Sequence, residues 1–180
     1  SAFEKAYPLA SDADGKFESA YYQGQALMAQ GKYAESADAL RKALNIKGSY
    51  KVAETLAKAE FKSGDFEGAA KAYESASRYK STFDALQGAT YSYLKLAYNA
   101  GKAGDEASSK TYWAQAAKWG GKASAAKPSD VKMAALYANA LFRSAQSGDA
   151  VGAYAKAIKL APAACDLMTE KGLSEFTLKK

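Results

Sequence analysis

Apolar and small residues recur along this chain with the spacing of amphipathic helices, not with the alternation of strands. A spacing of i, i+3, i+4 and i+7 places such residues on one stripe of a helix. In the first clear example these positions are Tyr21, Gly24, Leu27 and Met28. The same spacing returns after Gly31 and on both sides of Gly64. The pattern therefore predicts pairs of helices, each pair joined by a short turn that contains glycine.

The turn signals also repeat at a fixed distance. Gly31 and Gly64 lie 33 residues apart, and so do Tyr33 and Phe66. A period between about 20 and 50 residues is typical of stacked repeats, in which each repeat buries its apolar stripe against its neighbours. Composition agrees, because alanine, the best helix former, is abundant, while the chain has only three valines and two isoleucines. We therefore expect an all-α protein of about nine helices.

Three segments resemble the tetratricopeptide repeat (TPR), a helix-turn-helix unit. They are Gly31-Lys32-Tyr33 followed by Ala39–Leu44, Gly64-Asp65-Phe66 followed by Ala72–Ala76, and Ala153–Pro162, which ends in the closing proline of such a repeat. The resemblance implies a right-handed α-solenoid of stacked repeats. It also implies that the large residues Tyr73 and Tyr154 are mostly buried between repeats. Ser36 departs from the family, which usually has alanine at that position.

The expected organisation is one repeat domain over residues 1–171 and a loose tail over 172–180. Its parts are an initial segment over 1–8, repeat 1 over 17–48, repeat 2 over 50–80, an extended repeat 3 over 81–127, repeat 4 over 129–162 and a capping helix over 163–171. The initial segment is either the end of a repeat cut from a longer array or a short capping helix. We expect turns near Gly31, Gly64, Gly101–Gly104 and Gly148, a helix break at Gly120-Gly121, and Ser129 as a helix N-cap.

Catalysis finds little support in the residues. The chain has no histidine, which excludes Ser-His-Asp and Cys-His mechanisms within it, and its single cysteine, Cys165, permits no internal disulfide. The segment Asp12–Gly15 resembles part of a calcium loop, but two essential carboxylates are absent, so we interpret it as a solvated turn between helices. We expect no enzyme activity, no cofactor and no metal. No apolar run approaches the roughly 20 residues of a membrane helix.

The charge of the chain is moderately basic. Lys and Arg number 25 against 19 Asp and Glu, which gives +6. The lysines are spread along the whole chain and only three arginines occur, without a cluster, so nucleic acid is a disfavoured partner. A protein or peptide partner, acidic in character, fits the charge better. The sequence does not reveal the oligomeric state.

A partner is expected on the concave surface that the first helices of stacked repeats form, which we call the first-helix face. Aromatic and methionine side chains next to Lys and Arg favour a peptide-binding groove on this face, with apolar contacts to hold a peptide and charges to orient it. Tyr21, Phe61 and Phe142 could equally belong to the core. Lys132 and Asn139 match positions with which some TPR proteins grip a terminal carboxylate, but the other repeats lack the rest of that clamp. The candidate residues are Tyr21, Gln25, Met28, Lys51, Glu54, Lys58, Phe61, Lys62, Tyr93, Lys132, Asn139, Phe142 and Arg143.

The resemblance implies a non-enzymatic scaffold that binds a peptide segment or docks into a larger assembly. The alternative is an accessory repeat domain of a larger enzyme, receptor or envelope complex whose activity lies elsewhere. The sequence does not fix the compartment. A bacterial periplasmic or envelope protein without its export signal is the favoured hypothesis, with a cytoplasmic protein as the alternative.

Overall fold

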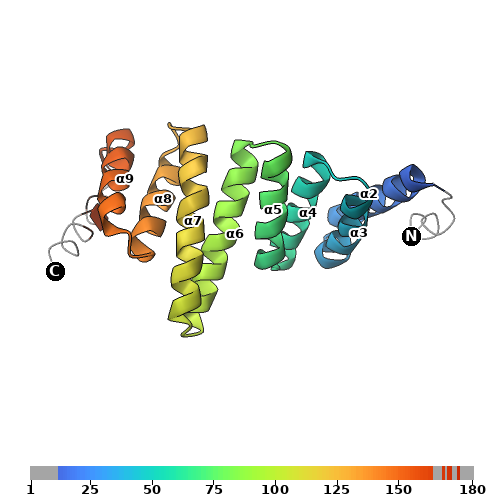
Figure 1. Ribbon diagram of the computed structural model, residues 1–180, viewed down its shortest axis with the longest axis horizontal. Coiled ribbons are helices and arrows are strands. Elements are labelled where there is room, and N and C mark those ends of the chain that lie inside the picture. The colour runs from blue at the N-terminus through green and yellow to red at the C-terminus, as the bar shows by residue number, and fades with distance from the viewer. Residues whose placement is uncertain (1–11, 164–167, 169, 172–173, 175–180) are drawn as a thin grey trace. The chain divides into compact units, whose positions relative to one another are not determined.

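The protein is built from helices that follow one another in pairs. The computed structural model describes residues 12–163, 168, 170, 171 and 174. Among these residues there are eight helices and no strand, which confirms the all-α prediction (Figure 1). The initial segment 1–8, Cys165 and most of the capping helix 163–171 lie outside the described residues. The helices are α2 (Ala13–Ala29), α3 (Tyr33–Ile46), α4 (Tyr50–Ser63), α5 (Phe66–Tyr79), α6 (Phe83–Lys102), α7 (Glu106–Ala126), α8 (Val131–Arg143) and α9 (Ser147–Leu160).

The chain divides into two compact units, and we describe each by itself. Unit 1 is Ser1–Gly88 and unit 2 is Ala89–Lys180, so the boundary falls inside α6. In unit 1, α2 packs on α3, α3 on α4 and α4 on α5. In unit 2, α7 packs on α8 and α8 on α9. Each unit therefore consists of helices that pack on the helices next to them in sequence, as in a repeat protein.

The core is made of many alanines and a few large side chains. In unit 2 a cluster that includes Ala116, Ala138 and Ala157 surrounds Tyr154, whose side chain is fully buried. In unit 1 the ring of Tyr73 packs directly over Gly88, and Tyr73 is 8% exposed. Small residues let helix backbones approach closely, and the large rings fill the space that is left. The predicted burial of Tyr73 and Tyr154 is confirmed.

Two hairpins have a buried serine five residues after the turn glycine, where the second hairpin has Ala69, and each serine makes a hydrogen bond. The hydroxyl of Ser36 in α3 donates to the backbone carbonyl of Gly24 in α2, with an O···O distance of 2.7 Å. Ser109 in α7 makes the same bond to the carbonyl of Ala97 in α6, at 2.9 Å. Both serines are buried, so these bonds satisfy hydroxyls that would otherwise be costly inside the protein. Each bond ties a second helix to its first helix.

The hairpin turns use a residue in the left-handed region of backbone space. Gly31, Gly64 and Gly104 have φ angles of 76°, 90° and 79°. In the fourth hairpin the same conformation belongs to Ala145, with φ of 66°. The expected turn at Gly148 is therefore wrong, because α9 begins at Ser147 and Gly148 lies in its first turn. The turn signal was misleading because glycine is favoured at this position but not required, and here alanine bears the strain.

Replacing Ala145 with glycine is expected to raise the free energy of unfolding by about 0.5–1 kcal/mol, because glycine adopts positive φ without a steric penalty. The matched variant is Gly104→Ala. No atom lies within 4 Å of the position its added Cβ would take, so only backbone strain changes, and we expect a loss of about 1 kcal/mol. Urea denaturation of both variants measures these effects. A loss of stability in Ala145→Gly would contradict the assigned turn.

The glycine pair in α7 does not break the helix. The helix runs without interruption from Glu106 to Ala126, so the expected break at Gly120-Gly121 is wrong. A Cβ on Gly120 would come within 3.4 Å of the Tyr137 Cα atom, and one on Gly121 within 3.1 Å of the Tyr137 ring. These glycines therefore let α8 approach α7 closely, and this packing offsets their poor helix propensity.

Two helix starts also differ from expectation, and in both an aspartate is the N-cap. The carboxylate of Asp12 accepts a hydrogen bond from the Gly15 amide at 2.6 Å, so α2 begins at Ala13 and Asp12–Gly15 is not an inter-helix turn. The carboxylate of Asp130, not Ser129, caps α8 by accepting from the Met133 amide at 2.9 Å. Aspartate is as good an N-cap as serine and also favours the positive end of the helix dipole.

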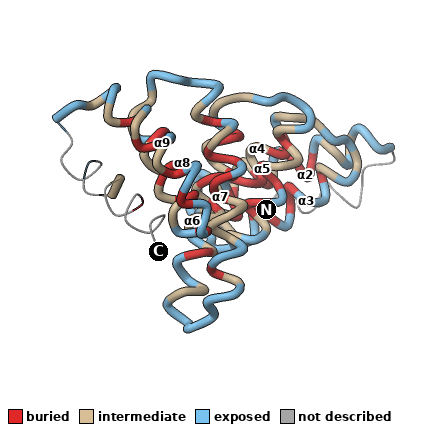
Figure 2. The backbone as a smooth tube through the Cα atoms, turned by 60° about the vertical axis from the view of Figure 1, so that its left-hand side comes forward, coloured by how far each residue is buried: buried red, intermediate tan, exposed pale blue. Residues whose placement is uncertain are grey.

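The hairpin of α6 and α7 is longer than the others. These helices have 20 and 21 residues, whereas α4 and α5 have 14 each. The six extra residues of α6 and the seven of α7 each make about two turns and about 10 Å, so nearly the same face of each helix points to the core. Within unit 2 the turn end of this hairpin extends past the ends of α8 and α9 (Figure 1), and most of its tip is exposed or half-buried (Figure 2). We call this part, residues 96–112, the hairpin extension.

Candidate partner-binding site

In unit 1 the candidate cations lie on a narrow solvent-facing stripe of α4. Lys51, Lys58 and Lys62 are exposed, while most of the rest of α4 is buried. Their spacing of seven and four residues places them on one side of the helix. Lys58 pairs with Glu54 at an N···O distance of 2.9 Å. The first-helix face of unit 1 is therefore exposed and partly neutralised within itself.

The aromatic candidates of unit 1 belong mainly to the packing. Tyr21 is 7% exposed, stacks on Phe17 with ring centroids 5.8 Å apart, and accepts a hydrogen bond from Gln25. Phe61 is half-buried and packs edge-on against Phe66, with centroids 5.2 Å apart. Met28 is half-buried. Tyr21 offers little surface to a partner, and we treat it as a core residue below.

In unit 2 the candidate cations lie over aromatic rings. The Lys132 ammonium is 5.4 Å from the centroid of the Tyr91 ring, and the Arg143 guanidinium is 5.1 Å from that of Trp113. Arg143 also donates through Nε to the Asn139 side-chain oxygen at 3.1 Å. Such cation–π contacts are worth about 0.5–1 kcal/mol at exposed sites and hold the cation in place. The residues therefore meet as cation–aromatic pairs, but with ring partners that the sequence analysis did not name.

The remaining candidates of unit 2 are half-buried. Tyr93 and Phe142 both pack against the cluster around Tyr154, and Tyr93 also contacts the Tyr112 ring at a centroid distance of 6.3 Å. Asn139 donates weakly to the Glu170 carboxylate at 3.4 Å. These side chains therefore have structural partners and expose only part of their surface.

The first helices of unit 2 carry charge of one sign only. From Ala89 to its end, α6 has Lys95 and Lys102, and α8 has Lys132 and Arg143, without any Asp or Glu in either segment. Residues 91, 95, 98 and 102 follow one another at four, three and four positions, so they share one stripe of α6. This charge of one sign is the main electrostatic feature of the two first helices in unit 2.

A pocket of about 490 Å³ lies where the hairpin extension meets the end of α8. Of its lining, only Arg143 was a candidate from the sequence. The signal for the missed residues in the sequence was the greater length of the third repeat, because the extra turns of α6 and α7 supply most of them. Besides Arg143, the polar and aromatic residues in its lining are Tyr98, Lys102, Glu106, Ser109, Lys110 and Trp113.

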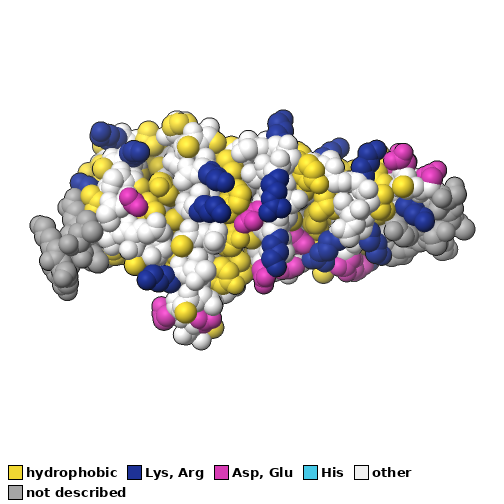
Figure 3. Space-filling model, in the orientation of Figure 1, with side chains coloured by type: hydrophobic (Ala, Val, Ile, Leu, Met, Phe, Trp, Pro, Cys, Tyr) yellow, Lys and Arg dark blue, Asp and Glu magenta, His cyan; other side chains and the backbone are white. Residues whose placement is uncertain are grey.

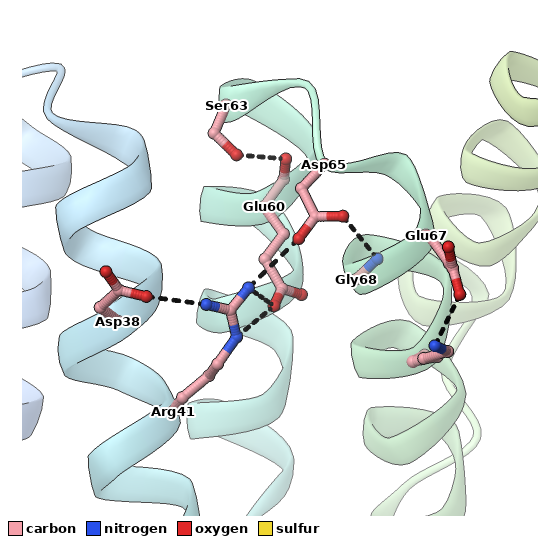
Figure 4. Close-up of polar contacts among 8 residues, drawn as sticks. Asp38, Arg41, Glu60, Ser63, Asp65, Glu67 and Gly68 are labelled. Carbon is pink, nitrogen blue, oxygen red and sulfur yellow. Dashed lines mark hydrogen bonds and ion pairs between the residues drawn. The ribbon is translucent and has the colours of Figure 1, made fainter. Parts of the chain in front are cut away.

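An ion-pair network around the buried carboxylate of Glu60 lies in unit 1 (Figure 4). The Arg41 side chain of α3 contacts Oε1 of Glu60 twice, through Nε at 3.0 Å and through Nη2 at 2.7 Å. The same guanidinium also forms ion pairs with Asp38 and Asp65. Burial raises the pKa of Glu60, and Arg41 partly offsets this. Because the network joins α3, α4 and the turn before α5, we interpret it as structural.

Comparison with solved structures identifies the fold. A MamA structure from Desulfovibrio magneticus RS-1, residues 41 to the end, is 16% identical and has a TM-score of 0.64 over 91% of this chain and 85% of that one. MamA AMB-1 is 14% identical with a TM-score of 0.68 over 92% and 84%. YrrB, described as a TPR protein with an unusual peptide-binding site, is 14% identical with a TM-score of 0.62 over 99% and 84%. The chain has the tetratricopeptide-repeat fold. No protein-family model and no curated protein matches its sequence.

The TPR fold confirms the stacked helix-turn-helix architecture expected from the sequence. In this arrangement α2, α4, α6 and α8 are the first helices of their hairpins and α3, α5, α7 and α9 the second helices. At identities below 20% the likeness concerns the fold, so the use of each surface has to be argued from this chain's own residues.

Other kinds of site find no support in the described part of the chain. No three Asp, Glu or Cys side chains gather there in a way that could hold a metal ion. Helices long and apolar enough to cross a membrane are also absent from it. On the face shown in Figure 3, Lys and Arg side chains stand among acidic and uncharged groups and form no continuous basic surface of the kind that follows a nucleic-acid backbone.

Proposed function

We propose that this chain is a non-enzymatic protein-interaction scaffold whose first-helix face binds an extended, acidic segment of a partner protein. The observation that carries the proposal is the one-signed charge of the first helices in unit 2, because segments 89–102 and 131–143 contain four cations and no Asp or Glu. Such a surface attracts negative segments and repels positive ones. A TPR protein with a peptide-binding site among the similar structures supports a peptide ligand.

The pairing of cations with rings suits this role. Lys132 over Tyr91 and Arg143 over Trp113 present a charged group beside an apolar surface. An acidic segment with interspersed apolar residues could therefore satisfy both kinds of contact. In unit 1, Lys62 over Tyr33 offers the same chemistry, with an ammonium-to-centroid distance of 5.1 Å. The charge steers association, and the apolar contacts slow dissociation.

The direct test is fluorescence anisotropy with a labelled peptide of alternating Glu and Leu, against a matched peptide of alternating Lys and Leu. We expect the acidic peptide alone to bind, and its affinity to fall between 0.1 and 1 M salt, where the Debye length shrinks from about 10 to about 3 Å. The double variant Lys95→Glu, Lys132→Glu should weaken binding about tenfold. Lys159→Glu on the exposed surface of α9, a second helix, is the control and should change it less than twofold. Equal binding of both peptides would contradict the proposal.

A further inference from the structure

The hairpin extension supplies most of the lining of the pocket at the end of α8. Lys102 ends α6, Glu106 and Lys110 belong to the first turns of α7, and all three line the pocket together with Arg143 from α8. The volume of about 490 Å³ lies within the usual range of ligand sites, about 300–1,000 Å³. We propose that this pocket is a further subsite, next to the first-helix face of unit 2, that binds acidic side chains, Asp or Glu, of a partner segment. The subsite rests on the proposed function, because it would receive the same acidic segment.

Charge complementarity identifies the occupant. Three cations, Lys102, Lys110 and Arg143, line the pocket against a single acid, Glu106. Within the described part of the chain, neither Lys110 nor Glu106 forms an ion pair, and Lys110 is exposed. Lys102 lies over the ring of Tyr98, with its ammonium 5.7 Å from the centroid. The pocket therefore has positive charge that the described residues do not neutralise, and carboxylates are the protein groups that complement it.

Arg143 is already held in position for a carboxylate. Its Nε is occupied by Asn139 at 3.1 Å, and its guanidinium lies over the Trp113 ring at 5.1 Å. The two terminal nitrogens of Arg143 make no ion pair among the described residues, so their donors stay available. A guanidinium fixed in this way loses little freedom on binding a carboxylate with two parallel hydrogen bonds. Asn139 is thus a positioning residue, and Arg143 the group that contacts the ligand.

Apolar surface beside these cations completes the subsite. Tyr98 is 59% exposed and Trp113 is half-buried, and both line the pocket. Tyr98 follows Tyr91 and Lys95 on the same stripe of α6, so the pocket continues the first-helix face of unit 2. A segment that runs along that face can therefore place a further acidic side chain in the pocket while its aliphatic neighbours contact Tyr98.

Lys110→Glu is the variant that isolates the subsite, because Lys110 lies on α7, outside the first-helix face. We expect it to weaken binding of the alternating Glu and Leu peptide on the order of tenfold. Lys110→Gln should have a smaller effect. Lys118→Glu is the matched control, since Lys118 is exposed, lies two turns further along α7 and does not line this pocket. It should change the affinity less than twofold.

A second measurement locates the peptide without any change of charge. The two tryptophans give two indole N–H signals in a nitrogen-15 NMR spectrum, and the variant Trp113→Phe assigns them. We expect the acidic peptide to shift the signal of Trp113, which lines the pocket, and to leave that of the buried Trp119 in place. A Trp113 signal that does not move at saturating peptide would overturn the subsite.

The variants separate this inference from the proposed function. If Lys95→Glu, Lys132→Glu weakens binding and Lys110→Glu does not, the subsite is wrong and the first-helix face stands. If only Lys110→Glu weakens binding, the pocket is the binding site and the proposed use of the first-helix face is wrong. If the acidic peptide does not bind the unmodified protein at millimolar concentration, both are wrong.

Discussion

Replacing Tyr73 with alanine is expected to lower the free energy of unfolding by about 3–5 kcal/mol, as truncations of large buried aromatic side chains do. The Tyr73 ring is 8% exposed and fills the space over Gly88 between α5 and α6. Burial raises its pKa to about 12.

Two controls define what this loss means. Tyr79→Ala removes the same side chain from the end of the same helix, where it is 53% exposed, and should cost less than about 1 kcal/mol. Tyr73→Phe keeps the ring and should also cost less than about 1 kcal/mol. Urea denaturation followed by circular dichroism measures all three variants. If Tyr73→Ala costs no more than Tyr79→Ala, the ring does not hold the α5–α6 contact.

The hairpins could be predicted from the sequence because helical periodicity and the 33-residue repeat report the same physical fact. Each helix must bury one stripe, and the resemblance to the repeat family implied that Tyr73 and Tyr154 lie on that stripe. Glycine was the unreliable signal. Gly104 supplies a positive φ, whereas Gly120 and Gly121 supply close packing, and the sequence does not distinguish these two uses of a missing Cβ. In the fourth hairpin the residue with positive φ is Ala145, whereas the turn was expected at Gly148.

The candidate site could be predicted only in part, because the sequence indicates which residues are exposed but not which side chains meet across helices. The register of the resembled repeat placed Lys51, Lys132 and Arg143 on the first-helix face, and all three are exposed. Contacts between helices do not follow from periodicity. The sequence therefore did not predict that Arg143 of α8 lies over the ring of Trp113 of α7. The pocket depends on how far one hairpin extends past its neighbour, which requires both helix lengths and their packing.

Removing the side chain of Arg41 is expected to cost about 3 kcal/mol, the second large effect. The Glu60 side chain is 3% exposed, and of its two oxygens Oε1 is bound by Arg41 while Oε2 accepts no hydrogen bond within the described residues. In Arg41→Ala the carboxylate would stay buried without its cation, a loss of about 3–5 kcal/mol for buried pairs. Arg41 itself is 44% exposed, which favours the lower end. Asp38→Ala, which removes only an exposed partner of Arg41, should cost less than about 1 kcal/mol.

The pH dependence of that loss distinguishes a buried charge from lost packing. Burial raises the pKa of Glu60 above 4.5, and Arg41 lowers it, so the pKa should rise further in Arg41→Ala. A folded state with the higher pKa binds the proton more tightly, so stability is greatest below the unfolded pKa and is lost as pH rises through the folded pKa. The cost of Arg41→Ala should therefore be small near pH 4 and grow toward pH 7. Adding Glu60→Gln to Arg41→Ala should remove most of this pH dependence in urea denaturation, whereas a cost that is equal at both pH values would assign the effect to the packing of the Arg41 stem.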